Sequence, residues 1–454
     1  MTRFLALLAL ILSPAAIAAP DPAALRDAAL DDTLAWEIVE GLTTEVGPRL
    51  AATDGEARGR AWAVERLKAL GFANVRIETF DMPVWKRGVE TAAVVAPFPQ
   101  PLTIAALGNS GATPAGGVTA PVVGFDGLEA LRAAPAAAVR GRIVFVTHQM
   151  AAQQDGGSYG RIGGIRREGP ALAAAKGAVA IVIRSIGTDS HRLPHTGVTS
   201  FPAGTAPIPA AALSVPDAEQ LSRILKRGRP VTLHLEIGAG MAGTAQSGNV
   251  IAEVPGRDPK AGIVLVGGHL DSWDQGTGAV DDGAGLAITT AAAKRIMAAG
   301  RPLRTIRVVW FGAEEVGGYG GDAYARAHAG ERHVLAAESD FGADRIWAFR
   351  ATAAAEKKPL VARVSALLAP LGISTYGDRA HGGTDVAPIA ATGVPVIDLG
   401  QDGTRYFDLH HTADDTLDKI DPAQLRQNVA AWTAVLAVLA NDPDDLGPVP
   451  AKGE

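Results

Sequence analysis

The chain has 454 residues, which is enough for two or three domains and a large hydrophobic core. Hydrophobic residues make up 47% and charged residues 20%, and the net charge is -6, so the composition is that of a globular protein and argues against a nucleic-acid or anionic-membrane partner. There is no cysteine, which excludes thiol nucleophiles, disulfides and cysteine-bound zinc, so any metal ion has to be bound by His, Asp or Glu.

The first residues, MTRFLALLALILSPAAIAAP, have the features of an export signal. Arg3 precedes an apolar run at 4–12 that is too short to span a bilayer, and Ala16-Ile17-Ala18 fits the small-x-small cleavage rule. A buried N-terminal helix is the alternative, but the segment that follows is polar and broken by proline. We expect 1–18 to be a signal peptide, and the mature protein to be periplasmic or secreted, without a membrane anchor.

The next part of the chain, 19–107, predicts the opening of an α/β domain. Apolar residues recur with helical spacing over 55–70, and Gly71 ends this pattern. An extended stretch, NVRIETFDMPVW, follows.

From about residue 108, Gly and Pro become frequent. Short apolar runs at 142–146 and 179–184 flank a predicted helix at 168–176. We interpret 108–240 as a smaller β-rich module inserted into the main domain, and GAGMAGTAQSGN as the linker that returns to it.

Over 241–454, apolar runs alternate with helical patterns. We predict strands at 263–266, 305–311, 333–337 and 394–399, and helices that include 285–299 and 359–368. Continuous apolar strands that alternate with helices predict an α/β fold with a mainly parallel central sheet flanked by helices.

Candidate metal ligands follow four of these predicted strands. They are His269 and Asp271, Glu314 and Glu315, Asp340, and His410 and His411. Each of them alone has an ordinary explanation, such as a surface His, a solvated Glu pair or a turn. Because the carboxyl ends of parallel strands line one crevice, their joint placement predicts a metal site.

The loop GGHLDSWDQGTGAVDDGAG adds Asp274, Asp281 and Asp282 to His269 and Asp271. Like charges this close repel each other, so a cation is expected among them. Two histidines and three carboxylates suit zinc. They can bind two tetrahedral ions only if one carboxylate bridges, which would place the ions about 3.5–4 Å apart.

The motifs HLDSWDQGTGAVDDGAG, FGAEEVGGYGG, ESDFGA, HGGTD and HHTADDTLDKI resemble those of the co-catalytic zinc aminopeptidase family. That family includes bacterial leucyl aminopeptidases, the glutamate carboxypeptidases and the transferrin receptor ectodomain. EVGPRL, PVWKRGVE, LPHTG and GHLDSWD are most similar to its plasma glutamate carboxypeptidase branch. The resemblance runs from about residue 35 to the C-terminal helix, and implies a zinc-exopeptidase fold of the phosphorylase/hydrolase-like kind.

The resemblance implies two Zn2+ ions per chain. Their ligands would be His269 and Asp340 for one ion, Glu315 and His411 for the other, and Asp281 as the bridge, with a cis peptide bond to Asp282. No ligand position departs from the family pattern.

The resemblance also assigns roles to residues that do not bind metal. Glu314 would be the general base, and Asp271 would hydrogen-bond the far nitrogen of His269. The inserted module resembles a protease-associated domain, which would shape the mouth of the site. His195 in LPHTG would lie near the substrate or have a structural role. The resemblance also implies a homodimer.

The expected function is therefore an exported di-zinc exopeptidase that acts on dipeptides or short unblocked peptides. Arg405 and Tyr406, before the His pair, could contact the substrate, although an exposed loop Arg is usually only solvated. The alternatives are a serine hydrolase with GGSYG (156–160) as its nucleophile elbow, a glutaminyl-cyclase-like acyltransferase with one zinc, and a non-catalytic binding module.

Overall fold

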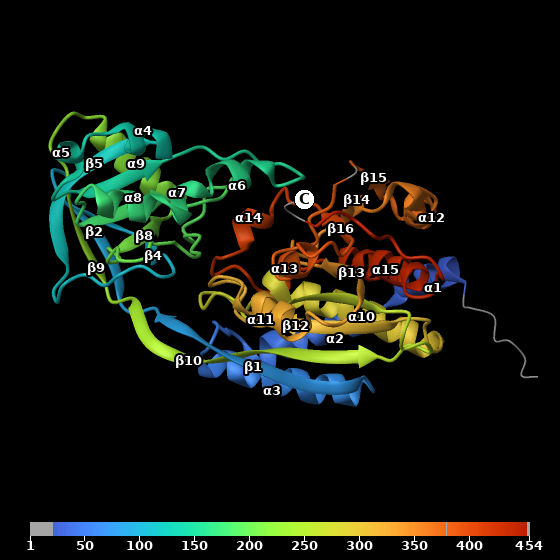
Figure 1. The fold of residues 1–454 in the computed structure, drawn as a ribbon. Coiled ribbons are helices and arrows are strands. Elements are labelled where there is room, and N and C mark those ends of the chain that lie inside the picture. Colours follow the sequence, from blue (N-terminus) through green and yellow to red (C-terminus); the bar gives the residue numbers. More distant parts are fainter. Residues whose placement is uncertain (1–20, 378, 452–454) are drawn as a thin grey trace, which may run out of the picture.

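A computed structural model describes residues 21–377 and 379–451. The predicted signal peptide at 1–18 lies outside the described residues. The chain forms two α/β units, each built on an eight-stranded sheet. Figure 1 shows the two units side by side, with the long strands β1 (Ala73–Lys86) and β10 (Gly240–Val254) running between them.

The first sheet has the strand order β1-β10-β12-β11-β13-β16-β14-β15. Its central strands run parallel, and they are β12 (Thr305–Phe311), β11 (Ile263–His269), β13 (His333–Glu338) and β16 (Val396–Gln401). Towards the edges, β10 and β14 (Ile346–Thr352) pair antiparallel with this core, and β15 (Ser374–Thr375) ends the sheet. The predicted α/β fold is thus confirmed, with a mixed sheet whose centre is parallel.

Successive side chains of each strand point to opposite faces of the sheet, and both faces are buried. Val266 packs in one hydrophobic cluster, while its neighbour Leu265 packs in another. The elements around the sheet are α1 (Pro22–Ala28), α2 (Leu34–Gly41), α3 (Asp54–Ala69), α10 (Ala284–Ala299), α11 (Tyr319–Ala327), α12 (Lys358–Leu368), α13 (Ala387–Ala390) and α15 (Pro422–Leu439).

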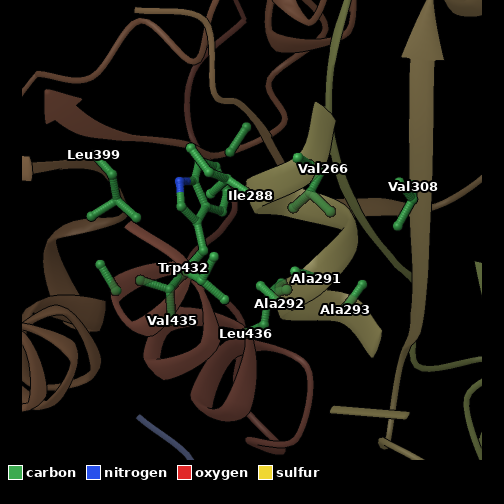
Figure 2. Packing of buried hydrophobic residues seen from close by; sticks show 14 of the residues in the cluster. Val266, Ile288, Ala291, Ala292, Ala293, Val308, Leu399, Trp432, Val435 and Leu436 are labelled. Carbon is green, nitrogen blue, oxygen red and sulfur yellow. The ribbon is translucent and has the colours of Figure 1, made fainter. Parts of the chain in front are cut away.

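The helices α10 and α15 pack against each other beside the sheet (Figure 2). Ala291 and Ala292 of α10 are small, so the two helices can approach closely, and the fully buried Trp432 of α15 fills the space near Ile288. Pro422 at the first turn and the side chain of Asp421, which accepts from the next free N–H groups, start α15. This packing fixes α10, whose N-terminus follows the acidic loop predicted to bind metal.

The second sheet has the order β3-β2-β9-β5-β6-β7-β8-β4. Its strands are β2 (Glu90–Ala96), β3 (Gln100–Leu102), β4 (Ile104–Ala106), β5 (Val118–Asp126), β6 (Ile143–Thr147), β7 (Ala180–Arg184), β8 (Ala210–Leu213) and β9 (Thr232–Ile237). Its helices are α4 (Leu128–Ala133), α5 (Ala136–Val139), α6 (Gly157–Ile162), α7 (Gly164–Arg167), α8 (Gly169–Ala175) and α9 (Val215–Leu225). The predicted start of the insert at 108 is therefore too late, because β2 to β4 already belong to this sheet. β2 pairs with β9, so the chain enters and leaves this unit through adjacent strands.

The predicted return linker GAGMAGTAQSGN does lead from the second unit back to the first, but it is a strand and not a loop. It forms most of β10, which pairs antiparallel with β1 from Ala73↔Glu253 to Lys86↔Gly240. Met241 there is 51% exposed, so little hydrophobic pattern marks the strand. The backbone partner that makes this stretch a strand lies far away in the sequence.

Glu56, in the first turn of α3, is fully buried and joins this helix to β10. One carboxylate oxygen accepts from Ser247 Oγ (2.5 Å), and the other accepts from the Ala52 N–H (2.7 Å). Burial raises the pKa of Glu56 from 4.5 to about 7, against the opposing charge of Arg60.

Because the folded-state pKa of Glu56 is the higher one, the folded protein binds this proton more tightly than the unfolded chain. Its contribution to the free energy of unfolding is present below pH 4.5 and is lost as the pH rises through about 7. We expect Glu56→Gln to remove this loss, because glutamine does not titrate. As the pH rises from about 4.5 to about 8, the free energy of unfolding of the variant should therefore increase by up to about 3 kcal/mol relative to that of the wild type. Urea unfolding at the two pH values measures the change, and an equal wild-type-to-variant difference at both contradicts it.

Candidate metal centre

Three neighbouring parallel strands deliver candidate ligands to one edge of the first sheet. His269 is the last residue of β11, Glu314 and Glu315 come shortly after β12, and Asp340 follows β13. β11 pairs with both β12 and β13, so these strand ends lie next to each other. They meet where an α/β sheet places its ligand crevice.

The fourth ligand position, Asp281, lies in the loop before α10. Its peptide bond to Asp282 is cis. The Asp282 carboxylate accepts hydrogen bonds from the main-chain N–H groups of His269 (3.1 Å) and Gly285 (3.1 Å). Asp282 thus anchors the loop to the end of β11 and leaves Asp281 to face the crevice.

All five expected metal ligands lie together. His269 Nε2 is 3.0 Å from Asp281 Oδ1 and 3.4 Å from Asp340 Oδ1. His411 Nε2 is 2.8 Å from Glu315 Oε2 and 3.3 Å from Asp281 Oδ2. Asp281 therefore presents one oxygen to each of two groups, and each group holds one imidazole and one further carboxylate.

The charges of this cluster fit bound cations. Among the described residues, no donor hydrogen-bonds to Asp281 Oδ2 or to Glu315 Oε1, although both atoms are buried. Burial, together with the neighbouring charge of Asp281, raises the pKa of Glu315 well above its usual range. Burial lowers the pKa of His411 to about 4, so its imidazole is neutral, which is the form that binds metal. Neutral imidazole and carboxylate oxygens are suitable zinc ligands.

Asp271 positions the site in a different way from the one predicted. The Asp271 carboxylate oxygen lies 3.8 Å from His269 Nδ1, whereas the main-chain oxygen of Asp271 lies at 2.8 Å. A carbonyl oxygen only accepts, so it places the proton on Nδ1 and leaves Nε2 for the crevice. The carboxylate instead accepts from the N–H groups of Glu314 (3.1 Å) and Glu315 (3.3 Å).

The Glu314–Glu315 turn is set by this carboxylate and by backbone geometry. Ala313 has φ 62, in the left-handed region that non-glycine residues rarely adopt. Glu314 lines the cavity that contains the metal-binding cluster. Burial raises the pKa of Glu314 to about 8, against the opposing charge of His269.

His410 and His195 lie behind the cluster. The ring of His410 stacks on His411 with centroids 3.6 Å apart, but its Nε2 is 3.8 Å from Asp281 Oδ2. These distances favour His411 over its neighbour as the ligand. His195 is fully buried and donates from Nδ1 to the Thr196 carbonyl (2.7 Å). Its other ring nitrogen, Nε2, lies 2.9 Å from His410 Nδ1. Of the two readings of His195, this position supports the structural one.

The second unit supplies part of the site wall. The main-chain N–H of Thr196 donates to the His411 carbonyl (2.9 Å), and the ring of Tyr159 in α6 stacks on Phe407 in α14 (Tyr406–Leu409) with centroids 4.2 Å apart. Figure 1 shows α6 at the end of its unit nearest to α14.

A cavity of about 480 Å³ lies between the two units. The second unit contributes Tyr159, Arg166, Arg167 and Val198, and the first contributes Glu314, Thr384, Phe341 and four of the five candidate metal ligands. The sequence did not indicate these side chains of the second unit, because they belong to no motif and meet the metal cluster only in the folded chain.

The structure also bears on the predicted nucleophile elbow at GGSYG and on the predicted substrate contacts of Arg405 and Tyr406. Ser158 of GGSYG is buried, its hydroxyl accepts from the Ala151 N–H (3.2 Å), and no strand leads into it, so the nucleophile-elbow arrangement is not present there. Arg405 pairs with Asp344 (2.6 Å) and does not line the cavity, whereas Tyr406 does.

Among the helices of residues 21–377 and 379–451, none has the length and apolar character needed to cross a membrane.

Comparison with known proteins agrees with this geometry. Residues 249–436 match Peptidase family M28. The chain is 35% identical over 413 residues to carboxypeptidase Q of Mus musculus, covering 90% of this chain and 85% of that protein. It is 34% identical over 410 residues to carboxypeptidase Q of Homo sapiens, covering 89% and 85%. Carboxypeptidase Q is plasma glutamate carboxypeptidase, so the resemblance inferred from the motifs is confirmed.

Solved structures show the same fold. The peptidase M28 precursor of Shewanella amazonensis SB2B has a TM-score of 0.92 at 46% identity, covering 95% of this chain and 98% of that chain. The zinc aminopeptidase of Bacillus subtilis has a TM-score of 0.63 at 20% identity, covering 92% and 97%. With its His, Asp and Glu cluster at the expected strand ends, the chain belongs to peptidase family M28 and is a zinc metallo-exopeptidase related to carboxypeptidase Q.

Proposed function

We propose that this protein is an exported di-zinc exopeptidase that hydrolyses the peptide bond of dipeptides or short unblocked peptides. The observation that carries the proposal is the position of Asp281, whose two oxygens each face a separate imidazole–carboxylate group. In this arrangement His269 and Asp340 would bind one zinc, Glu315 and His411 would bind the other, and Asp281 would be shared between them.

When bound, two zinc ions supply a water molecule that is acidic enough to lose a proton near neutral pH, and a Lewis acid for the peptide carbonyl. Glu314 is the general base that takes the proton of this water on a carboxylate oxygen and returns it to the leaving amine. Its position supports this role, because Glu314 lines the same cavity as four of the five candidate ligands. Burial raises the pKa of Glu314 to about 8. A positive charge beside it lowers this pKa, so that the carboxylate is ionised and can accept a proton.

Adjacent carboxylates can serve different roles because the turn that carries them is held from behind. Asp271 accepts both N–H groups of the turn, which directs Glu315 towards His411 and leaves Glu314 beside the cavity. The second unit, which we propose to be a protease-associated domain, covers this side of the site. Export remains a prediction from the sequence, and a homodimer remains an implication of the family resemblance.

The bridging position of Asp281 also distinguishes the alternatives. A glutaminyl-cyclase-like acyltransferase would use one zinc, and a binding module would have lost ligands. Five candidate ligands in two groups that share one carboxylate favour two ions.

We expect the purified protein to contain two zinc ions per chain. Chelation should abolish peptide hydrolysis and added zinc should restore it, because the clustered ligands bind the metal as a unit. Elemental analysis alongside a dipeptide assay measures both. One zinc per chain would favour the acyltransferase, and full hydrolysis by metal-free protein would refute the metal mechanism.

Glu314→Gln should retain both zinc ions, because Glu314 is not a ligand in this proposal. Its turnover number should fall by about 100- to 10,000-fold, since general acid–base catalysis is lost. Steady-state kinetics with parallel zinc analysis measures this. A variant with near-normal turnover would rule out Glu314 as the base.

Asp271→Asn should lower turnover by about 10- to 100-fold while the zinc ions are retained. The amide has one acceptor oxygen, so its NH2 group would face one of the two N–H groups of Glu314 and Glu315. The matched control is Asp274→Asn in the same loop, because Asp274 pairs with Arg87 (2.9 Å) and not with the two glutamates. Equal turnover of the two variants would contradict the positioning role of Asp271.

A further inference from the structure

Arg49, in the EVGPRL motif, is a fully buried cation that forms no ion pair. Its exposed fraction is 0%, and no carboxylate of the described residues lies within 4.0 Å of its guanidinium. The guanidinium instead donates to main-chain carbonyls, from Nε to Leu270, from Nη1 to Thr277 (2.6 Å) and from Nη2 to Gly278 (2.7 Å). Burying a charge without an ionic partner is costly, and these three hydrogen bonds, which offset part of that cost, all go to one loop.

This loop, 270–278, connects two of the candidate metal ligands. Leu270 directly follows His269, and the other two carbonyls directly precede the turn 279–283, which contains Asp281. The planar fork of the guanidinium therefore joins the end of β11 to the start of this turn. His269 Nε2 and Asp281 Oδ1, which lie 3.0 Å apart, are thus held from behind by a single side chain.

The backbone of Arg49 is fixed to the same loop. Its N–H donates to Ser272 Oγ (3.3 Å), and its carbonyl accepts from the Ser272 N–H (3.3 Å). Gly278 leaves room for the guanidinium, because a Cβ there would lie 2.6 Å from Nη1 and 2.8 Å from Nη2. Gly278 also has φ 62, so a residue without a side chain serves both the turn and this contact.

The positive charge of Arg49 lies near carboxylates but leaves their oxygens free. Burial lowers the pKa of Arg49, and the charges of four carboxylates raise it, namely Asp415, Asp271, Asp282 and Asp281. Because the guanidinium donates to carbonyls, it lessens the repulsion among these carboxylates without occupying an oxygen that a metal ion needs. Asp281 Oδ2 accordingly has no hydrogen-bond partner among the described residues.

We propose that Arg49 is a positioning residue, which holds Asp281 in place for zinc by clamping both ends of loop 270–278. This proposal rests on the proposed di-zinc site and adds to it a residue that contacts neither metal nor substrate. The hydrogen-bonded fork carries the effect, since the charge by itself would repel zinc ions. The clamp holds the ligands together against their mutual repulsion, so that less ordering is needed when zinc binds.

The test is Arg49→Lys, which keeps the positive charge but loses the planar fork. Residues that hold metal ligands in place contribute about 10- to 100-fold to metal affinity, so we expect the zinc affinity to fall by this factor. Competition with a chromophoric chelator measures the affinity. The absorption spectrum of the Co2+-substituted protein should change too, because Asp281 is no longer held in place. An effect of charge alone would leave both readouts unchanged.

Arg304→Lys is the matched control, because Arg304 has the same kind of environment far from the metal cluster. It is 2% exposed, and it donates to the main-chain carbonyls of Leu439 (2.9 Å) and Ala261 (3.2 Å). It directly precedes β12, whereas the candidate ligands follow the other ends of the strands. Both variants should lower the free energy of unfolding, but Arg304→Lys should keep the wild-type zinc affinity and cobalt spectrum.

Wild-type zinc affinity in folded Arg49→Lys would overturn the proposal, and so would an equal loss of affinity in Arg304→Lys. In both cases the wild type would still be a di-zinc peptidase. A zinc-loaded wild type that hydrolyses no peptide would instead refute the proposed function.

If Arg49→Lys does not fold, Gly278→Ala tests the clamp from the opposite side, because the added Cβ would displace the guanidinium. Its control is Gly228→Ala, where φ is 70 and no atom lies within 4 Å of the added Cβ. Gly278→Ala should bind zinc more weakly than Gly228→Ala. Equal zinc affinity of these two variants would overturn the proposal.

Discussion

The structure depends on the concentration of negative charge at one edge of a parallel sheet. Asp281 Oδ2 and Glu315 Oε1 are buried there without a hydrogen-bond partner among the described residues, and burial raises the pKa of Glu315. Such a cluster is tolerable only where positive charge can enter it. The strands, the acidic loop and the α10–α15 packing all serve to hold these carboxylates in place despite their mutual repulsion.

The second unit takes part in the same constraint. Its Thr196 carbonyl oxygen accepts hydrogen bonds from His195 Nδ1 and Arg166 Nη1. The same oxygen lies 3.4 Å from His411 Nδ1. One backbone oxygen thus orients a buried histidine, a cation and a candidate ligand together. Gly197 permits this approach, because a Cβ there would lie 1.9 Å from Arg166 Nη1 and 2.8 Å from His411 Nδ1. The two units therefore form one site rather than two independent ones.

Much of the fold could be predicted, because burial leaves a pattern in the sequence. The strand predicted at 305–311 coincides with β12, and the helix predicted at 285–299 differs from α10 by one residue. The predictions failed where backbone pairing alone decides the structure. β10 has exposed side chains in its first half, and only its pairing with β1 makes it a strand. The start of the insert was misplaced for the same reason, since β2 is defined by its pairing with β9.

The sequence by itself determined the ligand types, their order and their placement after apolar strands, because metal chemistry restricts residue identity and parallel strands bring their ends together. Only the tertiary structure decided that Asp271 holds the glutamate turn with its carboxylate and His269 with its carbonyl. It alone brought Arg166 next to His411, 245 positions along the chain. Contacts over such separations depend on how two units pack, and no local spacing of residues records that packing.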